Sequence, residues 1–404
     1  MNKLQKRLVP ELRFSEFSEF FELTKLKDIT KINQGLQIPI SKRYTEKVKD
    51  SYFYITNEFL RDKSKRAYFI VNPPESVICI ESDILMTRTG NTGQVVTNVI
   101  GAFHNNFFKI KYDKEKVDKI YLVIYLKLYK TQCMILRYAG TSTIPDLNHS
   151  DFYRLEIFLP KIKEQQKIGN FLTAVDQRIS LLKQKKAALE TYKKGLMQKF
   201  FSQEIRFKDE NSKDYPDWVE KRLGDVFARS TLKNRENNIS NVFTNSAIYG
   251  IVNQMEFFDH SVANKNNLEG YYIVEKDNFI YNPRISKFAP VGPLKRNKLD
   301  SGVMSPLYTV LKNKIGNKTY LEYYFDTTHW HRYMCGIANY GARHDRMNIQ
   351  NNDFMKMPIP YPSLEEQQKI ADCLSSMDQS INKLKNQIEQ TTQFKKGLLQ
   401  KMFV

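Results

Sequence analysis

Two segments of the chain carry the hydrophobic pattern of long amphipathic helices. In segment 160–202 apolar residues recur at alternating steps of three and four, and segment 362–404 repeats that pattern. Such spacing places the apolar side chains on one face of a helix and is typical of a coiled coil. We therefore predict two helices of about 36 residues, each ~54 Å long at ~1.5 Å per residue.

The two segments are also near-duplicates in sequence. They align without a gap at an offset of 202 residues, with 19 of 43 positions identical. A second partner on the same chain is present at high effective concentration, so pairing within the chain is favoured over pairing between chains, which is the alternative. The most similar stretches are Glu-Gln-Gln-Lys-Ile at 164–168 and 366–370, Asp-Gln at 176–177 and 378–379, and Lys-Lys-Gly-Leu at 193–196 and 395–398.

Local signals add detail to both helices. Ser363 followed three residues later by Glu366 predicts a capping box at the start of the second helix. Gly195 and Gly397 disfavour helix relative to alanine, so a break or a close approach is expected there.

The stretches between the helices share little sequence and are predicted to be mixed α/β domains. Short apolar runs such as 51–55 and 271–274 predict strands. Longer periodic stretches, 117–129 and 320–333, predict helices. The chain is thus an α/β (α+β) protein in which two different domains are each followed by one copy of a duplicated helix.

Composition and charge indicate the class of partner. The 404 residues include 63 Lys+Arg against 44 Asp+Glu, a net charge of +19, and 13% of residues are aromatic. A polyanion is the expected partner, and nucleic acid fits better than a membrane surface. The longest apolar run, 120–126, is too short to span a bilayer, and no export signal is present, so we expect a cytoplasmic protein. The cysteines stand too far apart for a disulfide scaffold: Cys79, Cys133, Cys335 and Cys373.

Motifs for catalysis are missing. No phosphate-binding Gly-x-x-x-x-Gly-Lys-Ser/Thr and no Asp/Glu-x-Lys tripeptide of metal nucleases occurs. Asn-Pro-Pro at 72–74 resembles the motif of adenine-N6 methyltransferases, but Glu75 stands where those enzymes need an aromatic residue, so a turn is favoured. Of His329, His331 and Cys335, only the last two share a helix face, too few to hold zinc. We expect no enzymatic activity, no metal site and no bound cofactor.

Polar loops are the candidate binding sites. Segment 88–94 lies between two apolar runs and contains two glycines, and segment 281–287 follows a comparable run in the second half. Arginine, asparagine, threonine and glutamine are the donors that contact phosphates and base edges, although an ordinary polar hairpin is the alternative. A third basic loop lies at 341–348, and segment 42–66 interleaves basic and aromatic residues. The candidate DNA-binding residues are Arg88, Thr89, Asn91, Thr92, Gln94, Arg284, Ser286, Lys287, Arg343 and Arg346.

The arrangement resembles the specificity subunit of type I restriction–modification enzymes. The resemblance rests on two variable domains, each followed by a helix that opens with Pro-x-x-x-Glu-Gln-Gln-Lys-Ile and carries Asp-Gln some ten residues later, and on segment 302–308. It implies target recognition domains at 15–160 and 207–360, separated by spacer helices at 161–202 and 362–404 that form an antiparallel coiled coil with pseudo-two-fold symmetry.

The resemblance also implies function and partners. The chain would read an asymmetric, two-part site on double-stranded DNA and direct two modification subunits, which methylate adenine N6 from S-adenosylmethionine. Restriction subunits that translocate DNA with ATP and Mg²⁺ would complete the enzyme, and no membrane is involved. The alternatives are a stand-alone DNA methyltransferase or nuclease with its own recognition domains, and a coiled-coil scaffold that does not bind DNA.

Overall fold

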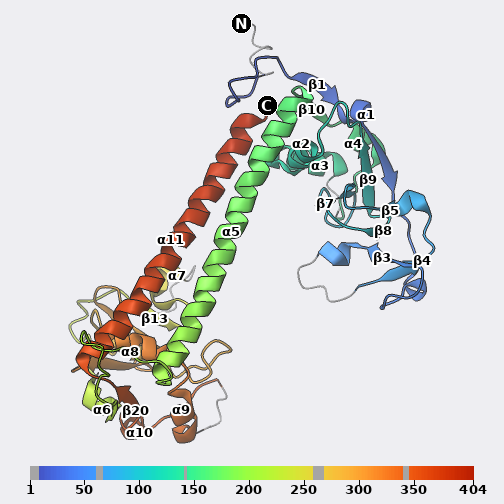
Figure 1. The fold of residues 1–404 in the computed structure, drawn as a ribbon. Helices are drawn as coiled ribbons and strands as arrows, with labels where there is room; N and C mark the ends of the chain where they lie inside the picture. Colours follow the sequence, from blue (N-terminus) through green and yellow to red (C-terminus); the bar gives the residue numbers. More distant parts are fainter. Residues whose placement is uncertain (1–8, 61–66, 141–142, 258–267, 340–344) are drawn as a thin grey trace. The chain divides into compact units, whose positions relative to one another are not determined.

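The structure divides into two compact units. The computed structural model describes residues 9–60, 67–140, 143–257, 268–339 and 345–404 of the chain (Figure 1). One unit comprises Met1–Lys183 with Asn386–Val404, and the other comprises Gln184–Lys385. Each contains one α/β domain and parts of both long helices. The domain limits given by the sequence stay predictions, because each compact unit also includes helical segments.

Unit 1 builds its domain from short strands and short helices. Segment 51–55, predicted as a strand, is β3, and the helix predicted at 117–129 is the shorter α2. The elements of this domain are β1 (Glu22–Lys25), α1 (Leu26–Ile29), β2 (Thr30–Gln34), η2 (Ile40–Lys42), β3 (Ser51–Ile55), η3 (Asn57–Leu60), β4 (Phe69–Val71), η4 (Glu75–Val77), β5 (Ile78–Cys79), β6 (Ile84–Thr87), β7 (Val95–Thr97), β8 (Gly101–Phe103), β9 (Phe107–Tyr112), α2 (Lys119–Lys127), α3 (Tyr129–Ala139), α4 (His149–Tyr153) and β10 (Glu156–Leu159).

Unit 2 follows the same plan with a different sequence. The strand predicted at 271–274 is β15. The elements are β11 (Val219–Arg222), α6 (Leu223–Val226), β12 (Phe227–Ser230), β13 (Phe243–Ser246), β14 (Gly250–Asn253), α7 (Gln254–Phe257), β15 (Tyr272–Val274), β16 (Phe279–Tyr281), β17 (Leu294–Arg296), β18 (Gly302–Met304), β19 (Thr309–Asn313), α8 (Lys318–Phe325), α9 (His331–Ile337), α10 (Asn351–Met355) and β20 (Pro358–Tyr361).

One prediction about unit 2 is wrong. Segment 320–333 forms two helices, α8 and α9, instead of one. The Thr327 hydroxyl donates to the Tyr324 carbonyl at 2.6 Å, and the Trp330 indole donates to the Phe325 carbonyl at 3.2 Å. Side chains that bond the last carbonyls of a helix substitute for the next helical turn, so α8 ends there.

The sheets establish which strands correspond between the units. The main sheet has the order β2-β9-β6-β7 in unit 1 and β12-β19-β16-β17 in unit 2, and all of its pairings are antiparallel. A second antiparallel pair joins the two ends of each domain, β1 with β10 and β11 with β20. The internal repeat therefore extends through the variable domains, where sequence alignment does not detect it.

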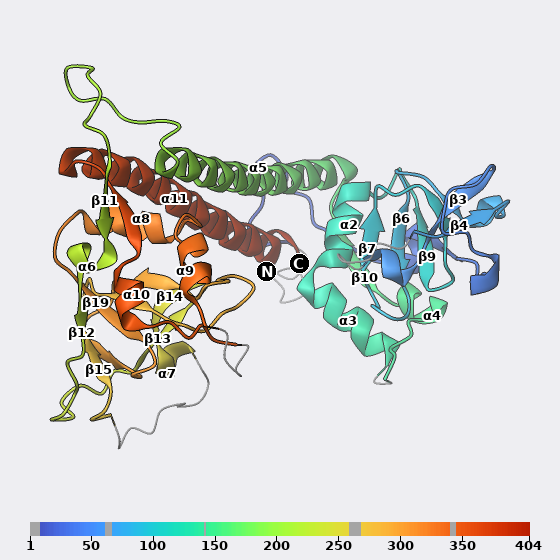
Figure 2. The same ribbon diagram turned by 90° about the horizontal axis from the view of Figure 1, so that it is seen from below.

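The long helices α5 (Ile162–Phe201) and α11 (Leu364–Met402) have 40 and 39 residues, slightly longer than predicted. Their antiparallel pairing is observed within each unit (Figures 1 and 2). In unit 1 the start of α5 shares a core with the end of α11, and in unit 2 the end of α5 shares a core with the start of α11. The buried residues concerned are Ile168, Leu172, Leu398 and Met402 in unit 1, and Phe200, Phe201, Ile370 and Leu374 in unit 2.

Two equivalent ion pairs connect the helices and explain part of the repeated sequence. Asp176 pairs with Lys395 at 2.6 Å in unit 1, and Asp378 pairs with Lys193 at 2.6 Å in unit 2. Each repeated aspartate thus meets the repeated lysine of the other helix, which accounts for lysines at seam positions.

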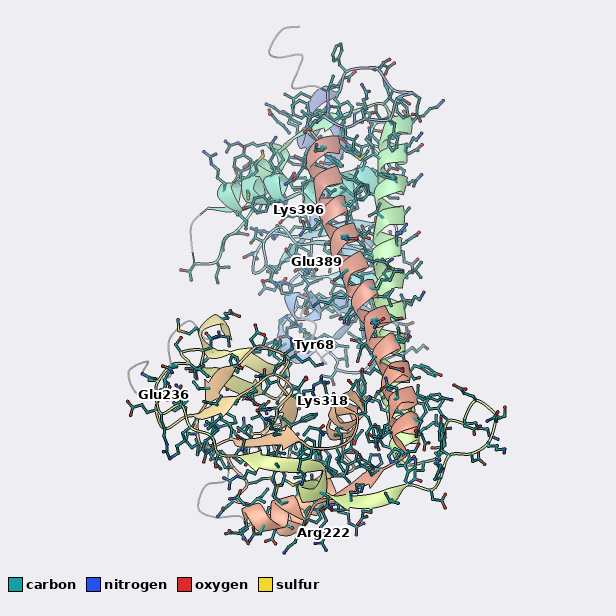
Figure 3. The ribbon with its side chains drawn as sticks, turned by 90° about the vertical axis from the view of Figure 1, so that its left-hand side faces the viewer. Tyr68, Arg222, Glu236, Lys318, Glu389 and Lys396 are labelled. Atoms are coloured by element: carbon teal, nitrogen blue, oxygen red, sulfur yellow. The ribbon has the colours of Figure 1, made fainter. Side chains whose placement is uncertain are left out.

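Glu389, labelled in Figure 3, lies on the exposed side of α11. No helix in the described ranges combines the length and the apolar character needed to cross a membrane.

Two local predictions for the helices are corrected. α5 and α11 continue unbroken through Gly195 and Gly397, and nothing lies within 4 Å of a Cβ placed at either glycine. The capping box of α11 forms only by half. The Glu366 N–H donates to the Ser363 hydroxyl at 3.2 Å, but the Glu366 carboxylate is engaged elsewhere.

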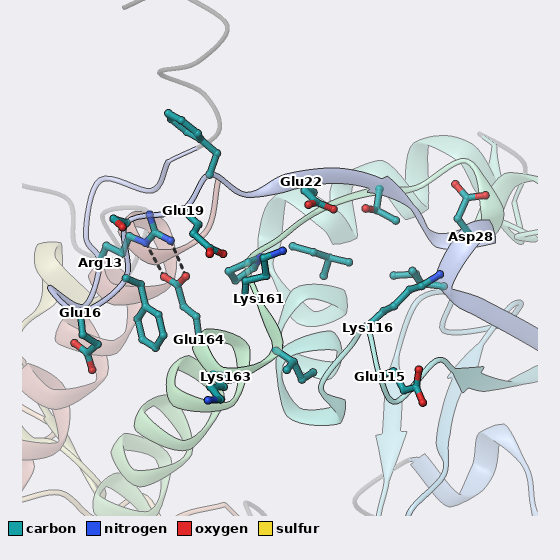
Figure 4. A pocket seen from close by; sticks show the side chains of 18 residues that line it. Arg13, Glu16, Glu19, Glu22, Asp28, Glu115, Lys116, Lys161, Lys163 and Glu164 are labelled. Carbon is teal, nitrogen blue, oxygen red and sulfur yellow. Dashed lines mark hydrogen bonds and ion pairs between the residues drawn. The ribbon is translucent and has the colours of Figure 1, made fainter.

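The repeated Glu-Gln-Gln motif fastens each domain to its helix. Glu164 accepts two hydrogen bonds of 2.7 Å from Arg13, and Glu366 accepts two, of 3.1 and 2.8 Å, from Arg206 (the first pair is drawn in Figure 4). Both carboxylates are almost fully buried. Bidentate arginine pairing compensates a buried carboxylate, so these pairs hold the start of each domain on the start of its helix.

The following glutamine of the motif has an equally structural role. The Gln165 side chain accepts from the Asp118 N–H at 2.9 Å and donates to the Lys116 carbonyl at 2.9 Å, next to the start of α2. Gln367 accepts from the Asn317 N–H at 2.8 Å, next to the start of α8. The glutamine thus bonds the residue that caps the first helix after the main sheet.

Candidate nucleic-acid interface

The two predicted binding loops occupy equivalent places in their units. The loop at 88–94 joins β6 to β7, and the loop at 282–293 joins β16 to β17. These are corresponding strands of the main sheets. The predicted strand–loop–strand arrangement of segment 88–94 is confirmed, and the second loop is a longer connection of the same kind.

Backbone pairing shows which residues of the two loops correspond. Thr89 pairs with Asp146 in unit 1, and Arg284 pairs with Arg346 in unit 2. Likewise, the carbonyl of Arg88 accepts from the Leu147 N–H as the carbonyl of Pro283 accepts from the Met347 N–H, both at 2.9 Å. Arg88 and Arg284 are therefore neighbours in register, not equivalents.

Arg88 is held within unit 1. Its guanidinium donates to Asp146 at 2.5 Å and lies 5.8 Å from the centre of the Phe108 ring. The side chain is only 20% exposed, and its Nε is buried without a hydrogen-bond partner among the described residues. Such a side chain supports the loop from inside, and only part of it is available to a ligand.

The other candidates of the first loop divide into buried and exposed groups. The Thr92 hydroxyl donates to the Pro145 carbonyl at 2.6 Å, and both Thr92 and Thr89 are half-buried. Asn91 and Gln94 are exposed, so they are the side chains that a ligand could meet. The loop lines a shallow hollow of about 700 Å³ together with residues of α2 and α3.

Lys127 places a charge in that hollow. Burial lowers the pKa of its ammonium group, and the nearby Lys395 lowers the pKa further. Losing contact with water disfavours the charged form, and a second positive charge has the same effect. Asp176 raises the pKa in part, and the Lys127 side chain is exposed to solvent.

The second loop presents its charges more openly. Arg284 is 63% exposed and lies 3.5 Å from Asp345. Ser286 and Ala289 close a tight turn through two backbone hydrogen bonds of 3.0 and 3.1 Å. Exposed Lys287 and Phe288 form the tip of that turn, and Phe288 is 68% exposed. An exposed aromatic side chain next to a lysine is suited to contact a base beside a phosphate.

A small pocket of about 250 Å³ lies beside this loop. Arg346, a candidate from the third basic segment, lines it and is 28% exposed, whereas Arg343 lies outside the described residues. Most side chains of the lining are polar. The lining is Thr244, Asn245, Ser246, Asn282, Pro283, Arg284, Leu307, Tyr308 and Arg346.

Segment 42–66 contributes less than its composition indicates. Arg43 donates to the Ile38 carbonyl at 2.9 and 2.7 Å and lies over the rings of Tyr54 and Tyr68, so it supports the fold. Tyr44 is 47% exposed and remains accessible. Residues 61–66 of the segment lie outside the described residues.

The segments that suggested chemistry are structural. Asn72 has a φ of 49° and leads into the short turn η4, so Asn-Pro-Pro forms a turn, as expected. His331 packs edge-on against Trp330, and Cys335 is exposed. Within the described ranges, no three potential metal ligands cluster.

Three residues of the loop regions were not predicted from the sequence: Asn57, Asn245 and Phe288. Asn57 and Asn245 end the same dipeptide, Thr-Asn, at 56–57 and 244–245, and each bonds a binding loop or its flanking strand. The repeated dipeptide was a signal, but too short to detect without the sheet pairing. Phe288 had no signal, because a single exposed aromatic residue is common on protein surfaces.

Comparison with known proteins identifies the family. The model of the family described as "Type I restriction modification DNA specificity domain" matches residues 19–191 and 215–391, which is most of the chain and both repeats. The chain belongs to this family.

Relatives and solved structures agree. The specificity subunit of the type I restriction enzyme MjaVIII from Methanocaldococcus jannaschii is 25% identical, over 94% of this chain and 91% of its own. The MjaIX specificity subunit of the same organism is 34% identical over 35% of each chain. The S subunit from M. genitalium has the same fold, with a TM-score of 0.56 at 17% identity over 98% of this chain and 99% of its own. The HsdS subunit from Thermoanaerobacter tengcongensis gives 0.51 at 18% identity over 95% and 96%.

The fold and the function that the sequence resemblance implied are therefore confirmed for this specificity subunit. The family match and the relatives support recognition of DNA on behalf of a type I restriction–modification system. They do not support the alternative of a stand-alone methyltransferase or nuclease.

Proposed function

We propose that this specificity subunit reads two different DNA half-sites, one with each α/β domain. The observation that carries the proposal is the pair of equivalent loops, 88–94 and 282–293, on sheets of identical strand order but with different side chains. Because the two domains share a fold but carry different loops, we expect an asymmetric two-part site with an unread spacer. The net charge of +19 supports contact with the phosphate backbone around both half-sites.

Within each loop, the exposed polar side chains are the proposed contacts to DNA. In unit 1 these are Asn91 and Gln94, with Arg88, Thr89 and Thr92 behind them. In unit 2 the exposed contacts are Arg284, Ser286 and Lys287, and the half-buried Arg346 lies beside the loop. Arg343 stays a sequence-based candidate of the same group.

Catalysis is assigned to partner chains. We propose that two modification subunits bring S-adenosylmethionine and methylate adenine N6, and that restriction subunits bring ATP and Mg²⁺ to translocate and cut DNA. The subunit itself would act in the cytoplasm without a cofactor. The missing Gly-x-x-x-x-Gly-Lys-Ser/Thr, together with Glu75 after Asn-Pro-Pro, supports this division.

Sequencing of DNA methylation tests the proposal. A host carrying this chain with its modification subunits should methylate adenine within one asymmetric, two-part sequence, and the purified chain alone should transfer no labelled methyl group. DNA affinity should fall steeply with salt, with a slope of about −0.9 per phosphate neutralised. Methyl transfer by the chain alone, or methylation without sequence preference, would contradict the proposal.

The helix pair α5–α11 is proposed to set the distance between the half-sites. Inserting seven residues after Leu182 and seven after Leu384 keeps the seam in register and adds ~10 Å at ~1.5 Å per residue. Since base pairs of B-DNA are ~3.4 Å apart, the unread spacer should lengthen by up to about three base pairs. The bases read in each half should stay the same, because neither loop is altered.

A further inference from the structure

Asn57 and Asn245 occupy one structural position in the two halves of the molecule. Tyr54 pairs in parallel with Ala102, the middle residue of β8, and Val242 pairs in parallel with Val303, the middle residue of β18. Both asparagines follow three residues after those anchors. The equivalence therefore comes from sheet pairing and does not depend on the similarity of the sequences.

Asn245 bonds both ends of the second loop. Its Nδ2 donates to the Ile280 carbonyl at 2.8 Å, in the strand before the loop, and to the Pro293 carbonyl at 3.1 Å, at the end of the loop. The Asn282 side chain returns a hydrogen bond of 3.0 Å to the Asn245 carbonyl. Asn245 is 3% exposed, so these bonds are not exchanged for water.

Asn57 also bonds the loop of its own domain, but at a different point of that loop. Its Nδ2 donates to the Thr89 carbonyl at 3.0 Å, within the first loop. The next residue, Gly90, has a φ of 91°, and a Cβ there would lie 2.1 Å from the Asn57 Nδ2. The loop backbone thus approaches the asparagine so closely that only glycine fits.

Both amides leave their oxygen without a partner. Asn57 Oδ1 and Asn245 Oδ1 are buried and accept no hydrogen bond from the described residues. For Asn245 the orientation is fixed, because turning the amide would place its oxygen against two carbonyl oxygens. Burying a hydrogen-bond acceptor without a donor costs free energy. The hydrogen bonds that each amide donates to its loop therefore offset that cost, at the equivalent position of both halves.

We propose that Asn57 and Asn245 are equivalent positioning residues, each of which holds the DNA-reading loop of its own domain in the conformation that recognises its half-site. The inference rests on the proposed function of these loops in reading DNA. The asparagines themselves need not touch DNA. Loop side chains would define which bases are read, and the asparagine would define where those side chains stand.

Asn297 provides a matched control in unit 2. It is fully buried, and its Nδ2 also donates to two carbonyls, of Glu275 at 3.0 Å and Asp300 at 3.1 Å. It follows β17, at the end of the β16–β17 hairpin away from the loop. Removing the Asn297 side chain therefore eliminates similar hydrogen bonds to backbone carbonyls but leaves the bonds that hold the loop intact.

The test uses the subunit in complex with its modification subunits and DNA carrying the methylated site. For Asn245→Ala we expect the preference for the correct over an altered second half-site to fall roughly ten- to hundredfold, from displaced base contacts, with discrimination at the first half-site unchanged. For Asn57→Ala we expect the preference at the first half-site to fall, with discrimination at the second half-site unchanged. Asn297→Ala should lower the melting temperature comparably and leave discrimination at both half-sites unchanged.

Hydrogen exchange supplies a second readout, since the Asn282 N–H that bonds the Pro293 carbonyl should exchange faster in Asn245→Ala than in Asn297→Ala. If Asn245→Ala does not fold, the proposal is tested by half-site discrimination of Asn57→Ala in the other unit. Equal losses at both half-sites, or a loss of stability with intact discrimination, would overturn the proposal. Failure of the unaltered complex to prefer any sequence would instead refute the proposed function.

Discussion

The loops 88–94 and 282–293 occupy equivalent places on the main sheets of the two units, yet they present different chemistry. In the first, the arginine is drawn inward to Asp146 and Phe108, and neutral Asn91 and Gln94 face outward. In the second, Arg284 is exposed, and a tight turn raises Phe288 at its tip. The comparison shows that two loops at equivalent places of one fold can present different side chains to a ligand.

Loss of the arginine–glutamate pairs that hold each domain on its helix should have the largest effect on stability, and it should occur in both halves. Arg13→Ala leaves the Glu164 carboxylate buried without its arginine, and Arg206→Ala leaves the buried Glu366 carboxylate with the hydrogen bond of 2.9 Å from the Trp218 indole. Each should lower the free energy of unfolding by about 3–5 kcal/mol. Urea denaturation measures the loss, and Lys401→Ala, which removes an exposed pair, is the control with a change within about 1 kcal/mol. A strong effect in one half only would show that the frames are not equivalent.

The arginines of the loops should differ from each other. Arg284→Ala should weaken binding to the second half-site by about 1–3 kcal/mol with little change in stability, because the side chain is exposed. Arg88→Ala should mainly lower stability, because it removes the bond to Asp146. Binding titrations and melting curves on both variants separate these outcomes. An Arg88 variant with normal stability and poor binding would mean that this arginine reaches the bases.

Phe288 should add a smaller contribution on the second side only. Phe288→Ala removes an exposed ring, so we expect unchanged stability and a loss of about 1 kcal/mol in DNA affinity from lost apolar contact. Phe288→Leu should retain part of that affinity if apolar area is what matters. Equal affinity of all three proteins would exclude the tip of the turn from the interface.

Acidic pH should destabilise both halves through histidines whose pKa values are lowered, and His104 carries the effect in unit 1. Burial, and to a smaller degree the nearby Arg43, lowers the pKa of His104 from its usual 6.5, and its neutral Nδ1 accepts from the Asn106 N–H at 3.1 Å. The folded state then binds fewer protons than the unfolded state, so stability is lost as the pH falls below about 6.5. In unit 2 the position equivalent to His104 is Ser305, which follows β18 as His104 follows β8, and burial instead lowers the pKa values of His329 and His331. His104→Asn should therefore reduce the pH dependence seen in melting curves of the whole chain, and the remainder should disappear when His329 and His331 are replaced as well.

The sequence allowed the frame to be predicted far better than the site. Heptads and the duplicated Glu-Gln-Gln and Asp-Gln motifs predicted the helices, because helix pairing imposes a regular period on residues such as Ile168 and Leu172. Whether Arg88 turns inward depends on Asp146, which is distant in sequence. The function of Asn57 and Asn245 depends on which strands are neighbours. Such long-range contacts leave no periodic pattern.

Replacing residues 207–360 by a second copy of residues 15–160 tests most directly whether each half-site is read by its own domain on a common frame. Methylation sequencing of a host carrying this chimera with its modification subunits should then find a symmetric site built from two inverted copies of the first half-site. The sequence of the original second half should disappear from the methylated set. Continued methylation of the original asymmetric site would contradict the account, because recognition would then not reside in the exchanged domain.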